Sequence, residues 1–174
     1  MVYLGCFFLW GNISIYVLSY FYQHCRSCSY TFIFMVDSML IFSNWTGYHI
    51  GVYLFQTRRW NAKLVICLGG TLSLSGVYLS SYTTGIRSFL AMYCCMNGIG
   101  CGTCYFVVLI CAWEWFPTKK GLVTGLTLGG YGFGSFLFSL ISTRLVNPEH
   151  TNPTIYDAAN DVTYYDSSVA DRAP

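Results

Sequence analysis

Residues 88–113 read SFLAMYCCMNGIGCGTCYFVVLICAW and contain no charged side chain. The hydrocarbon core of a bilayer is about 30 Å thick, and a helix needs about 20 mostly apolar residues to cross it. The stretch is long enough for that and is too long for a single strand of a sheet. It therefore predicts a membrane-spanning helix.

The composition of the whole chain supports the same surroundings. Of its 174 residues, 55% are hydrophobic and only 9% are charged, with a net charge of +2. Soluble proteins carry about 25% charged residues. The weak charge provides no basic field for nucleic acid, and so many aromatic residues exclude intrinsic disorder. The expected partner of this surface is the lipid bilayer.

Four more stretches of the same kind accompany the first. The predicted spans cover residues 2–22, 32–55, 62–82, 88–113 and 122–142. Strands of a membrane barrel would be about half as long and would alternate in polarity. The sequence therefore predicts an all-α, multi-pass membrane helix bundle over residues 1–142, followed by a polar, acidic loop over residues 143–174.

The basic residues of the short loops predict the orientation of this bundle. Arg58, Arg59 and Lys63 follow the second span, whereas Lys119 and Lys120 follow the fourth. Cytoplasmic loops carry an excess of Lys and Arg. The pattern predicts a cytoplasmic N-terminus and an extracellular or luminal location for residues 143–174.

Polar stripes in two spans are the candidates for a solute pathway. Asn12, Tyr16 and Tyr20 recur at helical spacing in the first span, and Tyr93 and Asn97 do so in the fourth. Polar side chains in a bilayer face other helices or a water-filled cavity. They indicate either hydrogen bonding between helices or the wall of a solute pathway, and the sequence favours neither alternative.

Small residues mark a candidate packing face on the fifth span. Glycines recur there at the spacing that lets helix backbones approach closely in lipid, and the candidates are Gly125, Gly129, Gly130 and Gly134. A nucleotide-binding glycine loop is not expected, because no strand precedes these residues.

Chemistry of other kinds finds little support. Asp37 is the only acidic residue well inside a span, which makes it a candidate proton carrier, although it lies near enough to the span's end to reach interfacial water. Most cysteines lie in apolar runs, where they act as small packing residues. The sequence predicts no metal site, no cofactor and no enzyme.

One segment carries a family resemblance. Residues 115–125 read WFPTKKGLVTG, which strongly resembles the loop between helices four and five in the oxalate/formate antiporter-like branch of the major facilitator superfamily. That branch shows W-F-P-x-K/R-K/R-G-x-x-x-G there, and the related monocarboxylate transporters show a similar pattern. The matching positions are Trp115, Phe116, Pro117, Lys119, Lys120, Gly121 and Gly125.

Further pieces fit in order, with one departure. Residues 10–16 look like the family's first helix, residues 97–102 like its fourth, and Asn147-Pro148 like the pair beyond helix five. The superfamily pattern between helices two and three is G-x-x-x-D-K/R-x-G-R. Here Phe55 stands at the aspartate position and only Gly51 and Arg59 match, which puts the charge latch of that loop in doubt.

The resemblance implies a fold of two six-helix halves with the substrate bound between them near mid-membrane. Residues 2–150 correspond to the first five helices, so the missing C-terminal half is an implied partner. The implied function is part of a carrier for small organic anions, namely mono- or dicarboxylates, that is not transport-competent alone. Helices one and four would line the pathway. The alternative is a stand-alone five-helix membrane subunit that binds or scaffolds another chain.

Overall fold

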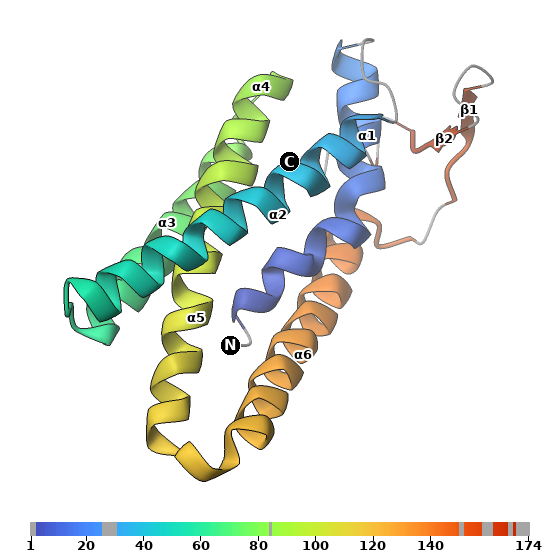
Figure 1. Ribbon diagram of the computed structural model, residues 1–174. Helices are drawn as coiled ribbons and strands as arrows, with labels where there is room; N and C mark the ends of the chain where they lie inside the picture. The colour runs from blue at the N-terminus through green and yellow to red at the C-terminus, as the bar shows by residue number, and fades with distance from the viewer. Residues whose placement is uncertain are drawn as a thin grey trace.

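The computed structural model describes residues 3–25, 31–83, 85–149, 152–157, 162–166 and 169, and this part of the chain is dominated by helices (Figure 1). They form five rods. The first three consist of η1 (Tyr3–Leu9) with α1 (Trp10–Cys25), α2 (Thr31–Val52) with η2 (Tyr53–Thr57), and α3 (Ala62–Ser80). The fourth joins α4 (Ile86–Phe89), η3 (Leu90–Asn97) and α5 (Gly98–Trp115), and η4 (Pro117–Lys119) leads into α6 (Lys120–Val146). The predicted all-α fold is confirmed.

Three of these rods are long and apolar enough by themselves to cross a membrane, within the part of the chain that is described. They cover Ala62–Ser80, Ile86–Trp115 and Pro117–Val146. The α1 helix has 16 residues and gains length from η1, while α2 carries Asp37, Asn44 and His49 among its 22 residues. Neither of the first two rods is among these three.

The last helix is longer than expected. It continues to Val146, whereas the sequence predicted an end near residue 142. The helix ends where Asn147 adopts a non-helical backbone with φ −129° and ψ 70°. Pro148 follows, and a residue that precedes proline is disfavoured in the α region. The Asn147-Pro148 pair thus acts as the stop signal.

Both α2 and α3 pack against the fourth rod, and the main buried cluster lies between α1, α2 and this rod. The cluster includes Trp10, Leu18, Phe21, Val36 and Tyr93, all buried. The helices approach so closely that a Cβ atom at Gly47 or Gly102 would collide with backbone atoms of the facing helix. Small residues permit this contact distance in membrane bundles.

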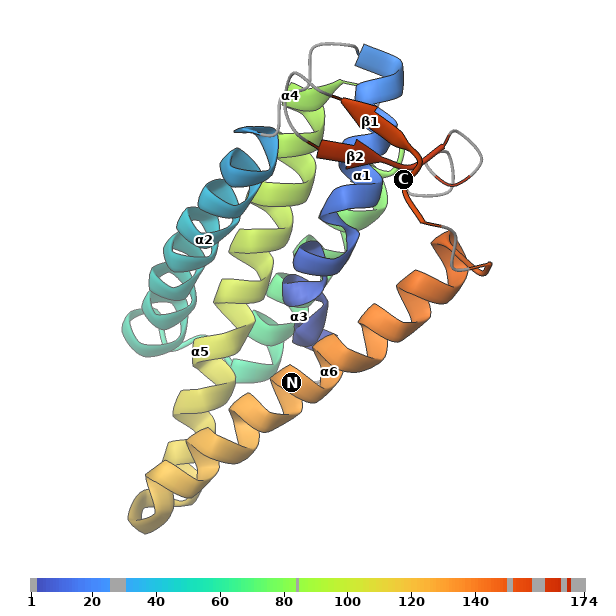
Figure 2. The same cartoon turned by 90° about the vertical axis from the view of Figure 1, so that its right-hand side faces the viewer.

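The α6 helix stands apart from this core. It turns sharply after α5 and then diverges from it, and only its middle meets η1 (Figure 2). Only 11% of the residues in its most apolar stretch are buried. Most of its large apolar side chains, such as Leu122, Leu126 and Phe136, therefore remain on the surface.

A small hairpin follows α6. Strands β1 (Ile155–Asp157) and β2 (Val162–Tyr164) pair antiparallel, with Tyr156 opposite Thr163. The hairpin lies against the end of α1 that is distant from the α5–α6 turn (Figure 2). A polar loop was expected over these residues, and the described part of it folds back onto α1 through Tyr164.

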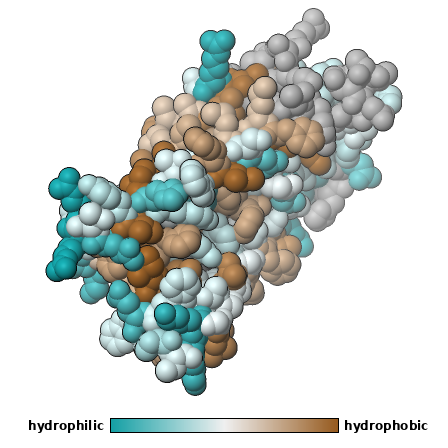
Figure 3. Space-filling view, viewed as in Figure 1, coloured by the Kyte–Doolittle hydropathy of each residue, from teal (hydrophilic) through white to brown (hydrophobic). Residues whose placement is uncertain are grey.

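The two basic loops lie away from the hairpin. The α5–α6 turn lies at the far end of the molecule from the hairpin in both ribbon views, and the α2–α3 connection lies on one side, nearer the middle (Figures 1 and 2). Figure 3 shows hydrophilic side chains at these two places, with apolar side chains between them and the opposite end. The hydrophilic side chains therefore lie at the two loops that carry the basic residues.

Candidate functional site

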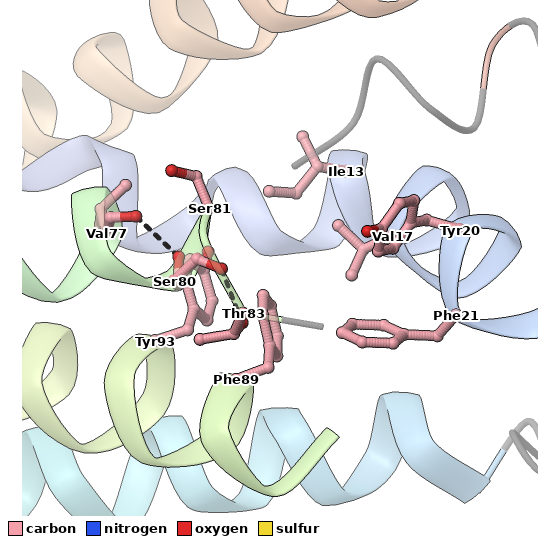
Figure 4. A pocket seen from close by; sticks show the side chains of 10 residues that line it. All are labelled: Ile13, Val17, Tyr20, Phe21, Val77, Ser80, Ser81, Thr83, Phe89 and Tyr93. Atoms are coloured by element: carbon pink, nitrogen blue, oxygen red, sulfur yellow. Dashed lines mark hydrogen bonds between the residues drawn. The ribbon is translucent and has the colours of Figure 1, made fainter. Parts of the chain in front are cut away.

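A cavity of about 130 Å³ lies between α1, the end of α3 and the start of the fourth rod (Figure 4). Four aromatic rings contribute to its wall, and they belong to Tyr20, Phe21, Phe89 and Tyr93. The rings of Phe89 and Tyr93 stack at 5.1 Å with an angle of 12° between their planes. The cavity therefore brings together Tyr20 from the first predicted stripe and Tyr93 from the second.

Hydroxyl groups at the end of α3 border the same cavity. The Ser80 hydroxyl donates to the carbonyl of Val77 at 2.7 Å, and the Thr83 hydroxyl donates to the carbonyl of Ser80 at 2.7 Å (Figure 4). Because these protons are used within the helix end, the oxygen lone pairs are what the hydroxyl groups can offer to a ligand. None of the ten lining residues is charged.

Asn97 lies one turn beyond Tyr93, between the fourth rod and α3, and only 1% of its side chain is exposed. Its Oδ1 accepts hydrogen bonds from the Ser73 hydroxyl at 2.6 Å and from the Cys101 thiol at 3.4 Å. The contact with Ser73 joins the fourth rod to α3, whereas Cys101 lies in the same rod as Asn97. Asn97 does not line the cavity.

Asn12 and Tyr16 lie elsewhere on α1. The Asn12 amide donates to the Thr143 hydroxyl on α6 at 2.9 Å. The Tyr16 ring lies 4.7 Å from that of Tyr165, and its side chain also packs with Val146 and Val169. The structure thus divides the five predicted pathway residues among three places, and their shared role remains a prediction.

The segment after β2 is fastened to α1 by tyrosines, and we call Tyr164 and Tyr165 the tyrosine clasp. The Tyr164 ring is fully buried and stacks on Tyr22 at 4.1 Å. The backbone N–H of Tyr165 donates to the Ser19 hydroxyl at 3.1 Å. Burial raises the pKa of Tyr165 to about 12, and its hydrogen bond with Tyr16 acts in the same direction.

The loop that carries the family resemblance forms a tight turn. Pro117 begins η4, where the missing N–H of proline is harmless. The Trp113 indole donates to the Thr124 hydroxyl at 3.0 Å and so joins α5 to α6 across the turn. Trp115 and Phe116 are exposed, as residues at a membrane interface would be.

The departing loop between α2 and α3 has its own local structure. Its π-helical segment η2 ends at Thr57. The guanidinium of the next residue, Arg58, donates to the Tyr53 hydroxyl at 3.2 Å and lies over the same ring. Arg59 has φ 53°, which is uncommon for a residue other than glycine. Tyr53 therefore holds the arginine in a loop that lacks the family's aspartate.

The candidate glycines of α6 and Asp37 differ in their exposure. Gly125 and Gly129 face open space, whereas Gly134 is buried and lies against Gly5. Gly130 is half-buried and Asp37 is exposed on α2. Within the described ranges no three His, Cys, Asp or Glu side chains gather as a metal site. His24, Cys25 and Cys28, which the sequence places close together, have side chains outside the described residues.

The closest helix crossings use glycines that the sequence analysis did not select. Gly47 and Gly51 on α2 face Ile99 and Thr103 on α5, and Gly98 and Gly102 on α5 face α2. Both pairs have the spacing G-x-x-x-G. The sequence therefore contained this spacing, but each pair has only two glycines, whereas the start of α6 has a longer series of them.

The fold and the cavity define the class of this molecule, a multi-pass helix bundle of an integral membrane protein. The chain is a distant homologue of transporters of the major facilitator superfamily, over part of their length. The relatives named below are carriers and transporters, not enzymes.

Three relatives illustrate the similarity. The chain is 33% identical to apicoplast pyruvate carrier 1 of Toxoplasma gondii over 114 residues, which is 62% of this chain and 20% of the carrier. It is 26% identical to monocarboxylate transporter 12 of Xenopus laevis over 156 residues, 84% of this chain and 32% of the transporter. It is 32% identical to the oxalate:formate antiporter of Oxalobacter formigenes over 88 residues, 50% of this chain and 21% of the antiporter.

The chain therefore spans between a fifth and a third of the length of these relatives. No family model matches the chain. No solved structure matches it either.

Proposed function

We propose that residues 1–142 form the N-terminal helices of a secondary active transporter that moves small organic anions, mono- or dicarboxylates, by alternating access. The observation that carries the proposal is the kind of relative that aligns here. The three described above are named for pyruvate, for monocarboxylates, and for oxalate and formate. All of these molecules are small carboxylates.

The arrangement of the bundle supports the same proposal. Carriers of this kind move by rocking one half against the other. In this chain α1, the end of α3 and the start of the fourth rod line a cavity, and Tyr20 and Tyr93 form part of its wall. Asn12, Tyr16 and Asn97 complete the proposed pathway, as neutral hydrogen-bonding groups for a carboxylate.

The proposed orientation has the N-terminus in the cytoplasm and residues 143–174 outside. It is supported by the positions of Lys119 and Lys120 at one end of the bundle and of the hairpin at the other (Figure 2). The rest of the carrier is the proposed partner. It would cover the exposed apolar side chains of α6, and transport would require it.

Uptake of labelled pyruvate and oxalate into proteoliposomes tests this proposal. We expect saturable uptake by the product of the whole native transcript and only background uptake by the 174-residue chain alone. In the longer product, Tyr93→Phe removes one hydroxyl group from the cavity and should lower uptake about tenfold, since a hydrogen bond to a charged group contributes about 1.5–3 kcal/mol. The control is Tyr78→Phe, which changes an exposed tyrosine on α3. Equal background uptake by both products would contradict the proposal.

A second candidate is a stand-alone five-helix subunit that binds another membrane chain without transport. The observation that favours it is the open face of α6, where Gly121, Gly125 and Gly129 meet nothing within 4 Å. Such a subunit would be recovered from native membranes as a stable complex with a different chain. A carrier would instead be recovered as one longer polypeptide.

A further inference from the structure

Trp10 and Asn97 each carry a buried hydrogen-bond donor that has no partner among the described residues. Trp10 is 2% exposed and Asn97 is 1% exposed. The indole N–H of Trp10 and the amide Nδ2 of Asn97 make no hydrogen bond there. Leaving a buried donor unsatisfied costs about 1–3 kcal/mol, so native structures rarely keep one without a functional reason or a bound molecule.

Both donors are neighbours of Tyr93. The Trp10 ring centroid lies 5.4 Å from that of Tyr93 and 6.0 Å from that of Phe89. Asn97 follows Tyr93 by four residues in the same helical segment. Tyr93 and Phe89 line the cavity, whereas Trp10 and Asn97 do not. Tyr93 therefore borders both the cavity in Figure 4 and the Trp10 ring, and Asn97 lies one turn further along the same segment.

The helix that carries Tyr93 is irregular at this point. Leu90–Asn97 form a π-helical segment, η3, within an otherwise α-helical rod. π-Helical turns are rare and occur frequently at functional sites. Because their hydrogen bonds run from i to i+5 rather than from i to i+4, a return to α-helix would change the direction of Tyr93 relative to Asn97. The segment thus has a local means of moving the Tyr93 ring.

We propose that Trp10 Nε1 and Asn97 Nδ2 donate hydrogen bonds to the carboxylate of a small organic acid, and that Tyr93 closes this site when it is empty. The rest of the acid would occupy the cavity lined by Phe21 and Phe89. This inference rests on the proposed function and assigns its substrate-binding donors.

Size and charge favour an acid with one carboxylate. A 150 Å³ apolar cavity can hold benzene, so a cavity of about 130 Å³ suits pyruvate, which has the same number of non-hydrogen atoms. Two neutral donors can serve one carboxylate. A second carboxylate, as in oxalate, would be buried among lining residues without charge, which is strongly unfavourable.

Indole nuclear magnetic resonance on the native 174-residue chain in lipid nanodiscs tests the site. Pyruvate is the probe, and each indole resonance is assigned by its Trp→Phe variant. We expect pyruvate to shift the Trp10 indole signal and to leave that of Trp45 unchanged, since Trp45 is exposed on α2. A shift of the Trp45 signal in place of that of Trp10 would overturn the proposal.

Pyruvate affinity measured by calorimetry on the same samples completes the test. Trp10→Phe keeps an aromatic ring but removes the N–H, so it should weaken pyruvate binding about tenfold, the equivalent of 1.4 kcal/mol. The matched control Trp45→Phe should leave the affinity unchanged, and oxalate should bind at least tenfold more weakly than pyruvate.

The outcomes separate the two proposals. Unchanged affinity in Trp10→Phe, or equal binding of oxalate, would overturn the assignment of the donors while leaving carboxylate transport intact. Uptake by the longer product together with no pyruvate binding to this chain would overturn it as well. Absence of both binding and uptake, for pyruvate and oxalate alike, would overturn the proposed function.

Discussion

A methyl group at Gly102 would collide with the carbonyl oxygen of Asn44 on the facing helix, whereas one at Gly129 would meet nothing within 4 Å. Both glycines lie in helices that are long and apolar enough to cross a membrane, yet one is required by a helix crossing and the other is not. The distance to the facing helix therefore decides the role of each glycine, and hydropathy alone does not.

The first prediction compares these two positions. Gly102→Ala should destabilise the bundle by about 1–3 kcal/mol, because an added methyl group in a close-packed contact forces the helices apart. Gly129→Ala should be neutral or should stabilise it by up to about 1 kcal/mol, because alanine favours helix more than glycine does. Thermal unfolding in detergent, followed by circular dichroism, measures both. An equal loss of stability in the two variants would contradict the described α2–α5 crossing.

At the same scale, the sequence predicted some side chains well and others poorly. It predicted that cysteines in apolar runs serve as packing residues, and Cys104 and Cys94 do pack in this way, with their thiols directed at backbone carbonyls on α3 and α2. It could not predict which side of α1 each polar residue would face. That depends on where α6 and the hairpin return, and helical spacing contains no such information.

At the scale of single elements, the tyrosine clasp holds the β1–β2 hairpin against α1. A short hairpin is marginally stable by itself in water. Here Tyr164 buries its ring against Tyr22, and Tyr165 binds Ser19 and contacts Tyr16. The sequence did not predict this hairpin, because its strands have only three residues each and are too short to show alternating polarity.

The second prediction concerns the pH dependence of this clasp. The neutral form of the Tyr165 phenol is favoured, because burial and the hydrogen bond with Tyr16 raise its pKa from 10.0 to about 12. The contribution of Tyr165 to stability should therefore be complete below pH 10.0 and should be lost as the pH rises toward 12. The difference in tyrosinate absorbance between the native chain and Tyr165→Phe follows this group together with its hydrogen-bonded partner Tyr16. A midpoint at the ordinary tyrosine value would contradict the buried contact.

Helix ends behaved as local chemistry predicts. The Asn61 side chain accepts a hydrogen bond from the Lys63 N–H at the start of α3, as an N-cap residue does, and Pro148 follows the end of α6. The π-helical segments η2 and η3 were not predicted, since hydrophobic periodicity does not distinguish them from α-helix.

At the scale of the whole molecule, composition was sufficient for the class of fold. Sparse charge and long apolar stretches require that backbone groups be satisfied within each segment, which helices achieve. The arrangement of the rods was less accessible. The position of α6 depends on few contacts, mainly with η1, and no local pattern specifies them.

The third prediction concerns orientation. Val162→Thr creates an N-x-T glycosylation acceptor at Asn160, beyond the end of α6, and keeps a β-branched residue in β2. We expect glycosylation of this variant in endoplasmic-reticulum microsomes, because the proposed orientation places the segment in the lumen. The matched variant Lys63→Thr creates an acceptor at Asn61 in a basic loop and should remain unmodified. The opposite pattern of modification would reverse the orientation.

The central claim is that these helices are part of a longer carrier, and the size of the native membrane product tests it most directly. An antibody against residues 152–166 would detect that product in native membranes. The account predicts a polypeptide several times larger than the 19.7 kDa of this chain, because the relatives extend far beyond the aligned region. A stable product of 19.7 kDa, with no larger form, would contradict it.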